Sequence, residues 1–246
     1  MLRSVRRGVA CLGKEVSNVN VEGGRTLIGG VDEAGRGPVI GPMVLACVVC
    51  ERDRLSSLVA LGVRDSKSLT PARRERLYKH ITGLALEVGV KVVGPKEIDE
   101  SVGTHFNLNR LEAKVTADLI RSLKHTPSLL YVDSPDPVAR RYGELLTRLL
   151  EERGIKGLEV IADNRADRKY VVVSAASVVA KVVRDRIIEG LKRFYGDFGS
   201  GYPSDPRTLS FLRSWTRTGR LPPIVRRSWA TLKKLSRARE GEEKHF

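Results

Sequence analysis

The chain has 246 residues, a formal net charge of +15 at pH 7 and a sequence pI of about 10.1. Its 41% hydrophobic and 30% charged residues are typical of a soluble globular protein, and no apolar run approaches the roughly 20 residues of a transmembrane helix. No signal-peptide core is found, so we expect a cytoplasmic protein. Three scattered cysteines exclude a disulfide scaffold or a zinc site.

The excess positive charge indicates a polyanionic partner, most often nucleic acid. It is concentrated at the C-terminus, where residues 207–246 contain eleven Lys or Arg and three Glu, a net charge of +8. A basic protein of the membrane surface is the main alternative, but no long helix pairs a Lys/Arg face with a bulky apolar face. The absence of glutamine and the five asparagines favour a thermophile.

The pattern of apolar residues and turn signals predicts five strands and several helices. Residues 1–25 show no clear period and are expected to form a basic, loosely held extension. Strands are predicted at about 26–33, 39–50, 86–94, 128–133 and 158–162. The second is apolar almost throughout, which predicts burial of both its faces. Helices are predicted at about 52–62, 70–82 with Thr70 as the N-cap, after Asn107, and at about 137–152, 172–195, 206–219 and 226–239.

This order predicts a mixed α/β sheet followed by an appended lobe of helices. Three separate strands end in acids: Asp32 and Glu33 after the first, Asp133 after the fourth, and Asp163 or Asp167 just beyond the fifth. In open α/β sheets, ligands bind outside the carboxyl ends of the strands. Four carboxylates there could hold two divalent ions about 3.5–4 Å apart, which is the arrangement for in-line attack on a phosphodiester.

The acids of the first strand open a glycine-rich turn, Gly35-Arg36-Gly37. Its backbone N–H groups and its arginine suit a phosphate, while its glycines allow the backbone to approach a ligand closely. The alternative for the acidic pair is a solvated turn with two surface acids. A nucleotide-binding P-loop is excluded because no Gly-Lys-Ser/Thr follows the glycines.

Six motifs in order make the chain resemble the type 2 ribonuclease H family, in its archaeal-type ribonuclease HII form, over roughly residues 27–235. They are Gly30 to Pro38 with Ile40-Gly41-Pro42, Asp65-Ser66-Lys67, Tyr131 to Ser134, Ala166 to Tyr170, Ser174 to Ser177 with Ala180-Lys181, and Gly196 to Pro206. The chain departs from the family pattern at Val171, where many relatives have proline, and at Asp163-Asn164, where Glu-His is more usual.

The resemblance implies an RNase H-like fold: a mixed five-stranded sheet flanked by helices, with a C-terminal helical lobe. We expect three regions: a basic extension at 1–25, which lies outside the resemblance, a catalytic domain at 26–195 and a basic, substrate-binding helical lobe at 196–246. The resemblance assigns catalysis and metal binding to Asp32, Glu33, Asp133 and Asp167, and so selects Asp167 over Asp163. The implied cofactor is Mg²⁺ or Mn²⁺, two ions per site, in a monomeric enzyme.

The resemblance also implies the substrate and its contacts. Family members cleave the RNA of RNA–DNA hybrids and cut 5′ of single ribonucleotides in duplex DNA, leaving 3′-OH and 5′-phosphate ends. Only the 2′-OH distinguishes RNA from DNA at a given sugar, and the Gly35-Arg36-Gly37 turn would read it. Tyr202 would stack on the following deoxyribose. The expected phosphate-backbone contacts are Lys67, Ser177 and Lys181.

Two other functions stay open from the sequence. One is another nuclease of the same fold class, such as a junction resolvase or integrase. The other is a nucleic-acid-binding or ribosome-associated protein whose acids are structural. Archaeal relatives can also carry a sliding-clamp-binding peptide at the C-terminus. This chain contains only Phe246 of that motif. The alternative to a clamp-binding peptide is a disordered charged tail.

Overall fold

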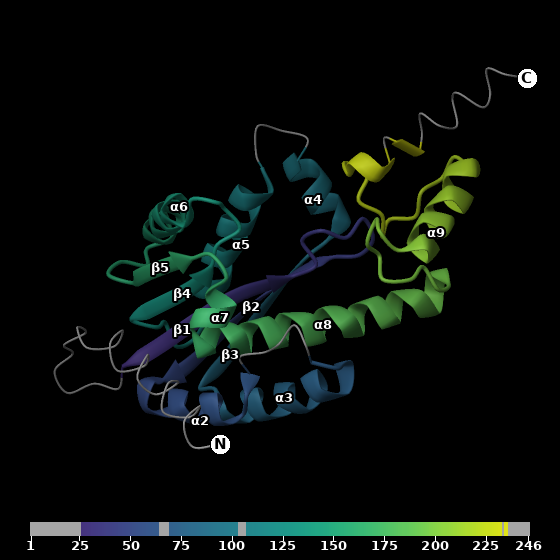
Figure 1. Ribbon diagram of the computed structural model, residues 1–246. Coiled ribbons are helices and arrows are strands. Elements are labelled where there is room, and N and C mark those ends of the chain that lie inside the picture. Colours follow the sequence, from purple (N-terminus) through teal and green to yellow (C-terminus); the bar gives the residue numbers. More distant parts are fainter. Residues whose placement is uncertain (1–25, 64–68, 103–106, 233, 236–246) are drawn as a thin grey trace, which may run out of the picture.

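The computed structural model describes residues 26–63, 69–102, 107–232, 234 and 235. They contain one five-stranded sheet with helices on both faces (Figure 1). The strands are β1 (Leu27–Ala34), β2 (Met43–Glu51), β3 (Glu87–Val93), β4 (Leu129–Asp133) and β5 (Glu159–Asp163). The helices are η1 (Arg52–Arg54), α2 (Leu55–Ala60), α3 (Pro71–Leu84), α4 (Pro95–Val102), α5 (Leu108–Arg121), α6 (Ala139–Glu152), α7 (Ala166–Lys169), α8 (Val171–Tyr195) and α9 (Pro206–Arg217).

The sheet has the strand order β3-β2-β1-β4-β5. β1, β2 and β3 pair antiparallel, while β4 is parallel to both β1 and β5. β1 is therefore the central strand, and it ends at the same edge of the sheet as β4 and β5. The predicted mixed α/β sheet is confirmed, and this topology is what brings the carboxyl ends of three strands together.

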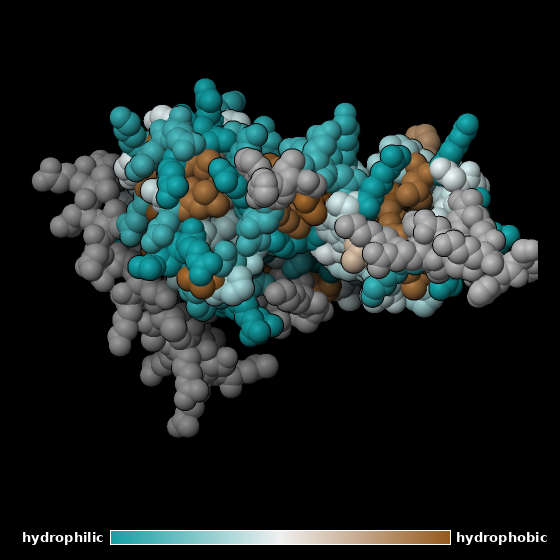
Figure 2. Space-filling model, turned by 90° about the horizontal axis from the view of Figure 1, so that it is seen from above, coloured by the Kyte–Doolittle hydropathy of each residue, from teal (hydrophilic) through white to brown (hydrophobic). Residues whose placement is uncertain are grey.

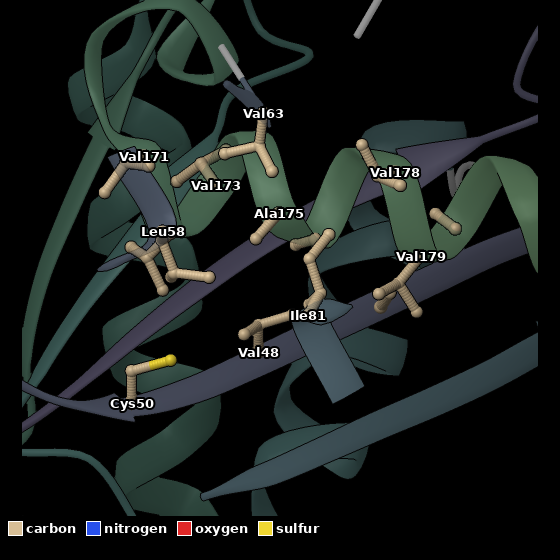
Figure 3. Packing of buried hydrophobic residues seen from close by; sticks show 14 of the residues in the cluster. Val48, Cys50, Leu58, Val63, Ile81, Val171, Val173, Ala175, Val178 and Val179 are labelled. Atoms are coloured by element: carbon tan, nitrogen blue, oxygen red, sulfur yellow. The ribbon is translucent and has the colours of Figure 1, made fainter. Parts of the chain in front are cut away.

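Both faces of β2 are buried, as its continuous apolar sequence predicts. Its even-numbered residues from Val44 to Cys50 pack with α2, α3 and α8. Its odd-numbered residues from Met43 to Val49 pack with α4, α5 and α6. Figure 3 shows the first of these layers, where side chains of β2, α2, α3 and α8 converge. On the face seen in Figure 2, by contrast, hydrophobic residues form separate patches among hydrophilic ones.

The long helix α8 crosses directly over the central strand. A Cβ atom at Gly30 would lie 2.5 Å from the carbonyl oxygen of Val172, so only glycine allows this approach. The N-terminal half of α8 is buried, and its side chains supply much of the core on this face. The close crossing places residues of α8 beside the acidic end of β1. None of the described helices has the length and apolar character needed to cross a membrane.

A third apolar cluster joins the sheet domain to the C-terminal residues. It combines Val39 and Ile40 with Ile188, Phe198, Leu212 and Val225. Ile40 and Val225 form an antiparallel bridge, and Figure 1 shows this end of the chain beside α9 and the end of α8. The segment after β1 is therefore held against residues almost 190 positions later in the sequence.

Two predicted boundaries are wrong. The strand predicted from residue 39 begins at Met43, because Gly41 has a left-handed backbone (φ 89°) and Pro42 lacks the N–H that a ladder needs. The helix predicted from residue 226 begins only at Ala230, because the backbone N–H groups of Arg226, Arg227 and Ser228 donate to acceptors elsewhere in the fold. The predicted extension at 1–25 lies outside the described residues.

Candidate active site

The acids of the first and fourth strands meet at one edge of the sheet. Val31 is aligned with Val132 in the parallel pairing of β1 and β4, so Asp32 and Asp133 occupy the next positions on neighbouring strands. Asp32 is only 5% exposed, whereas Glu33 and Asp133 are partly exposed. The topology therefore produces the convergence that the strand endings predict.

The short helix α7 carries the fourth acid of the predicted set. Its first residue, Ala166, donates its N–H to Oδ1 of Asp133 at 2.7 Å, and the preceding Arg165 has the left-handed backbone (φ 57°) that makes the sharp turn. Asp167 is buried next to this junction. Asp163 instead forms an ion pair with Lys169 at 2.5 Å. The assignment of Asp167 as the fourth functional acid stays a prediction.

Burial and mutual repulsion oppose ionisation of these acids. Burial first, and then the negative charge of Glu33, raise the pKa of Asp32 well above its ordinary value. Desolvation, followed by the charge of Glu112, raises the pKa of Glu33 to about 8, although Arg36 opposes this shift. Two adjacent carboxylates that are difficult to charge are stabilised when a cation is close. The site has the electrostatic character expected for hard divalent ions with oxygen ligands.

The donor set fits Mg²⁺ or Mn²⁺ in type, since all four side chains are carboxylates. Among the described residues, no three His, Cys, Asp or Glu side chains already surround a common point as ligands. The carboxylates are engaged with protein donors: Asp32 accepts from the N–H of Glu33 at 2.7 Å and from the Ser177 hydroxyl. Such bonds partly satisfy the carboxylate oxygens within the protein.

Helix α8 contributes the predicted residues Ser177 and Lys181. Ser177 is buried and hydrogen-bonds Asp32, and Lys181 donates its Nζ to the Ser177 hydroxyl at 2.8 Å. The Ser177 hydroxyl thus links Lys181 to Asp32 at the acidic edge. The role of both residues as phosphate contacts stays a prediction. Lys67, the third predicted contact, lies outside the described residues.

The glycine-rich turn lies beside the predicted sugar-reading aromatic. A Cβ atom at Gly37 would lie 3.5 Å from Cε1 of Tyr202, which is 41% exposed. Gly35 has a left-handed backbone (φ 85°), and a Cβ atom there would lie 2.7 Å from the carbonyl oxygen of Pro42. The turn and Tyr202 therefore form one partly exposed surface, although 165 residues separate them.

Sequence reasoning missed the residues that hold Arg36. The Arg36 guanidinium donates to the carboxylate of Glu112 and to the side-chain carbonyl of Asn109, both on α5. Glu112 is only 2% exposed, and burial raises its pKa to about 7 although Arg36 opposes the shift. A signal was present in the sequence, because Glu112 interrupts the apolar stripe of α5 that contains Leu108, Val115 and Leu119.

The basic C-terminal lobe needs one correction. Arg226 is one of the eleven basic residues that the sequence makes available to a polyanion, but its side chain is fully buried. Arg213, Arg217 and Arg220, by contrast, are exposed on or just after α9. Only part of the charge in this lobe can therefore meet a nucleic acid.

Comparisons with known proteins agree with this geometry. The family model described as Ribonuclease HII matches residues 29–232. Ribonuclease HII of Pyrococcus abyssi is 49% identical over 210 residues, which covers 85% of this chain and 90% of the relative.

Two solved structures are also similar. The crystal structure of ribonuclease H2 from Pyrococcus horikoshii has a TM-score of 0.80 and 45% identity, covering 87% of this chain and 98% of the other. A structure of the PCNA:RNase HII complex from Archaeoglobus fulgidus has a TM-score of 0.76 and 43% identity, covering 85% of this chain and 96% of the other. With three acid-bearing strand ends in place and matches of this extent, the chain belongs to the ribonuclease HII family of metal-dependent endoribonucleases.

Proposed function

We propose that this enzyme hydrolyses the RNA strand of RNA–DNA hybrids and cuts on the 5′ side of single ribonucleotides embedded in duplex DNA. The products would carry 3′-OH and 5′-phosphate ends. The observation that carries this proposal is the position of the Gly35-Arg36-Gly37 turn. It follows the acids of β1 directly and lies against Tyr202, so a group that reads a sugar and a group that cleaves its phosphate would be neighbours.

Asp32, Glu33, Asp133 and Asp167 would hold the divalent ions. When bound, Mg²⁺ or Mn²⁺ supplies activation of the attacking water and stabilisation of the leaving 3′ oxygen. The contribution of the chain is to orient the ligands: Ser177 and the N–H of Glu33 fix Asp32, and the N–H of Ala166 fixes Asp133. Ligands held by such neighbours are already oriented when the ions arrive.

The Gly35-Arg36-Gly37 turn and Tyr202 would select the substrate. The glycines let a ribose approach the backbone, whose groups can hydrogen-bond the 2′-OH. Tyr202 presents an exposed ring beside Gly37 for stacking on the next deoxyribose. Lys181, and Lys67 from the segment outside the described residues, would contact phosphates.

The test is cleavage of an end-labelled RNA–DNA hybrid, with a DNA duplex and an RNA duplex of the same sequence as controls. We expect cleavage of the hybrid alone, in Mg²⁺ or Mn²⁺, and its loss on addition of chelator. Cleavage that persists in chelator, or equal cleavage of the DNA duplex, would contradict the proposal. A four-way DNA junction in the same assay separates this function from that of a resolvase.

We also propose that the C-terminal segment ending in Phe246 binds a sliding clamp. The structure of an Archaeoglobus relative in complex with PCNA supports this. The segment lies outside the described residues, and of the family's clamp-binding motif its sequence contains only Phe246. Deletion of the last six residues should weaken binding to the clamp at least tenfold while hybrid cleavage without clamp is unchanged. Equal clamp binding with and without the segment would contradict the proposal.

A further inference from the structure

Three successive carbonyl groups of the glycine-rich turn are held by one short segment near the C-terminus. Arg226 donates Nη2 to the oxygen of Gly35 at 2.5 Å and Nη1 to the oxygen of Arg36 at 2.9 Å. Trp229 donates Nε1 to the oxygen of Gly37 at 3.0 Å. The Arg226 guanidinium also lies over the Trp229 ring, 4.8 Å from its centroid. We call Arg226 and Trp229 the turn clamp.

The turn clamp is itself fixed to the sheet domain. The N–H of Arg226 donates to the oxygen of Val39 at 2.8 Å, and its Nε donates to the oxygen of Gly41 at 2.9 Å. The next two N–H groups, of Arg227 and Ser228, both donate to the carboxylate of Asp99 on α4. The clamp therefore holds the turn from an anchored position, and the turn cannot shift without breaking these bonds.

The Arg226 side chain donates to backbone carbonyls, of Gly35, Arg36 and Gly41, rather than to a carboxylate within the part of the chain that the structure describes. Burial lowers its pKa to about 9, with a further contribution from the charge of Arg184. Burying a cation in this way is unfavourable, whereas a simple packing role could be filled by an apolar side chain.

The positions of the carbonyls determine where the N–H groups of the turn point. All described peptide bonds are trans, and in a planar trans peptide the C=O and the N–H point in opposite directions. Because the clamp binds the carbonyls of Gly35 and Arg36, the N–H groups of Arg36 and Gly37 point away from it. Among the described residues, neither N–H donates to a backbone acceptor. Pro38 has no N–H, so the N–H groups of Arg36 and Gly37 are the two donors whose direction is set by carbonyls that the Arg226 side chain binds.

We propose that Arg226 and Trp229 are positioning residues for ribose recognition: they orient the turn so that the N–H groups of Arg36 and Gly37 can donate to a 2′-hydroxyl oxygen. Discrimination between ribose and deoxyribose would then depend on two side chains that do not touch the substrate. This inference rests on the proposed function, because it assumes that the turn reads the 2′-OH. The alternative is that the clamp only joins the C-terminal segment to the sheet domain.

The experiment compares binding rather than turnover. Two labelled DNA duplexes, identical except for one ribonucleotide, are titrated in chelator with wild type, Arg226→Lys and Trp229→Phe. The matched controls are Arg227→Lys, which makes the same change at an exposed neighbour, and Trp215→Phe, which changes the other tryptophan of the chain. The measured quantity is the ratio of the two dissociation constants, together with the melting temperature of each variant.

We expect wild type and both controls to bind the ribonucleotide duplex about tenfold more tightly, as about two net hydrogen bonds would give. Arg226→Lys should reduce this preference to about twofold or less, and Trp229→Phe should reduce it by about threefold. The affinity of Trp229→Phe for the all-DNA duplex should stay unchanged. Trp229→Phe removes one donor and keeps an aromatic ring, so it tests the inference even where Arg226→Lys fails to fold.

Two results would overturn the inference. One is that Arg226→Lys and Trp229→Phe prefer the ribonucleotide duplex over the all-DNA duplex as strongly as wild type does. The other is that the variants lose affinity equally for both duplexes, which indicates a purely structural role. A wild type that cleaves hybrids but shows no binding preference would overturn it as well, since the turn would then not read the sugar. Failure of wild type to cleave any hybrid is a different result and would count against the proposed function itself.

Discussion

Arg36 and Glu112 form an ion pair that joins the glycine-rich turn to helix α5, across 76 positions of sequence. Glu112 is buried, and its charge in turn raises the pKa of Glu33 at the acidic edge. The arginine expected to hold a substrate phosphate is thus already paired with a carboxylate. A phosphate at this position would compete with Glu112 for the guanidinium, and the same charges affect the ease of ionising Glu33.

Burial of the carboxyl groups of Glu112 and Glu33 makes the stability of the fold depend on pH when no divalent metal is present. The folded-state pKa values of Glu112 and Glu33, about 7 and about 8, lie above the ordinary value of 4.5. The folded protein then binds more protons than the unfolded chain, so stability decreases as the pH rises from about 4.5 through 8. The titration of Glu112 changes the free energy of unfolding by at most about 3 kcal/mol over this range.

Glu112→Gln should therefore weaken the pH dependence of unfolding in chelator, because glutamine does not titrate. Denaturant unfolding of wild type and variant at several values between pH 5 and 8.5 measures this. Glu144→Gln, at an exposed position of α6, is the control and should leave the wild-type slope unchanged. Identical slopes for Glu112→Gln and wild type would show that Glu112 is ionised throughout.

Asp133→Asn should abolish cleavage while binding of a hybrid is preserved. An amide keeps an oxygen that can accept from the N–H of Ala166, but it removes the charge required by a metal ligand. Single-turnover cleavage and hybrid affinity are to be measured on the same preparation.

Asp163→Asn is the matched control, since Asp163 is aligned with Asp133 on the neighbouring strand and is paired with Lys169. It should retain activity to within about threefold. If the two variants exchanged these outcomes, the assignment of the acids would be wrong.

The two glycines of the turn should respond differently to alanine. At Gly37 a Cβ atom makes only an ordinary contact with Tyr202, so Gly37→Ala should fold and lose recognition of the ribose that approaches there. Gly35→Ala forces a left-handed alanine against the Pro42 carbonyl and should destabilise the protein by at least about 2 kcal/mol. Melting temperatures and single-ribonucleotide cleavage distinguish the two effects. A stable Gly37→Ala enzyme with full activity would contradict close approach of the sugar at this position.

Tyr202→Ala should slow cleavage at a single embedded ribonucleotide by roughly tenfold or more. Aromatic stacking on nucleic acid is worth about 1–3 kcal/mol, and about 1.4 kcal/mol corresponds to one factor of ten in rate. A long hybrid has no RNA-to-DNA junction at most of its cleavage sites, so its cleavage should decrease less. Tyr202→Phe retains the ring and should behave nearly as wild type. Equal losses on both substrates would indicate that Tyr202 supports the fold instead.

The exposed arginines of the lobe should set the salt dependence of binding. Replacing Arg213, Arg217 and Arg220 with glutamine should weaken hybrid binding and reduce the slope of log K against log salt by about 0.9 for each phosphate that is no longer neutralised. Truncation from residue 226 is not a suitable test, because it also removes the buried Arg226. An unchanged slope would place these arginines away from the substrate.

The sequence predicts the sheet well, because most of the strands are apolar runs and Asp32, Glu33 and Asp133 stand at the ends of two of them. Asp167 lies on α7 beyond β5, so the strand pattern alone does not select it. Helix α4 has no counterpart among the predicted helices because only Ile98 of its eight residues is buried, which leaves almost no apolar period to recognise. The turn clamp and the Arg36–Glu112 pair could not be predicted from spacing, since they join segments about 190 and 76 positions apart. Such contacts are set by tertiary packing: the break in the apolar stripe of α5 marks Glu112 as unusual, but no local pattern identifies Arg36 as its partner.

The position of the cut in a DNA duplex that contains one ribonucleotide is the most direct test of the proposed cleavage. Both strands are end-labelled, the enzyme is incubated with Mg²⁺ or Mn²⁺, and the products are compared with an alkaline ladder, with Asp133→Asn as the inactive control. We expect a single cut on the 5′ side of the ribonucleotide, leaving a 3′-OH that a DNA polymerase can extend. A cut on the 3′ side, cuts scattered along the DNA, or no cut at this site while long hybrids are cleaved would contradict the proposed function.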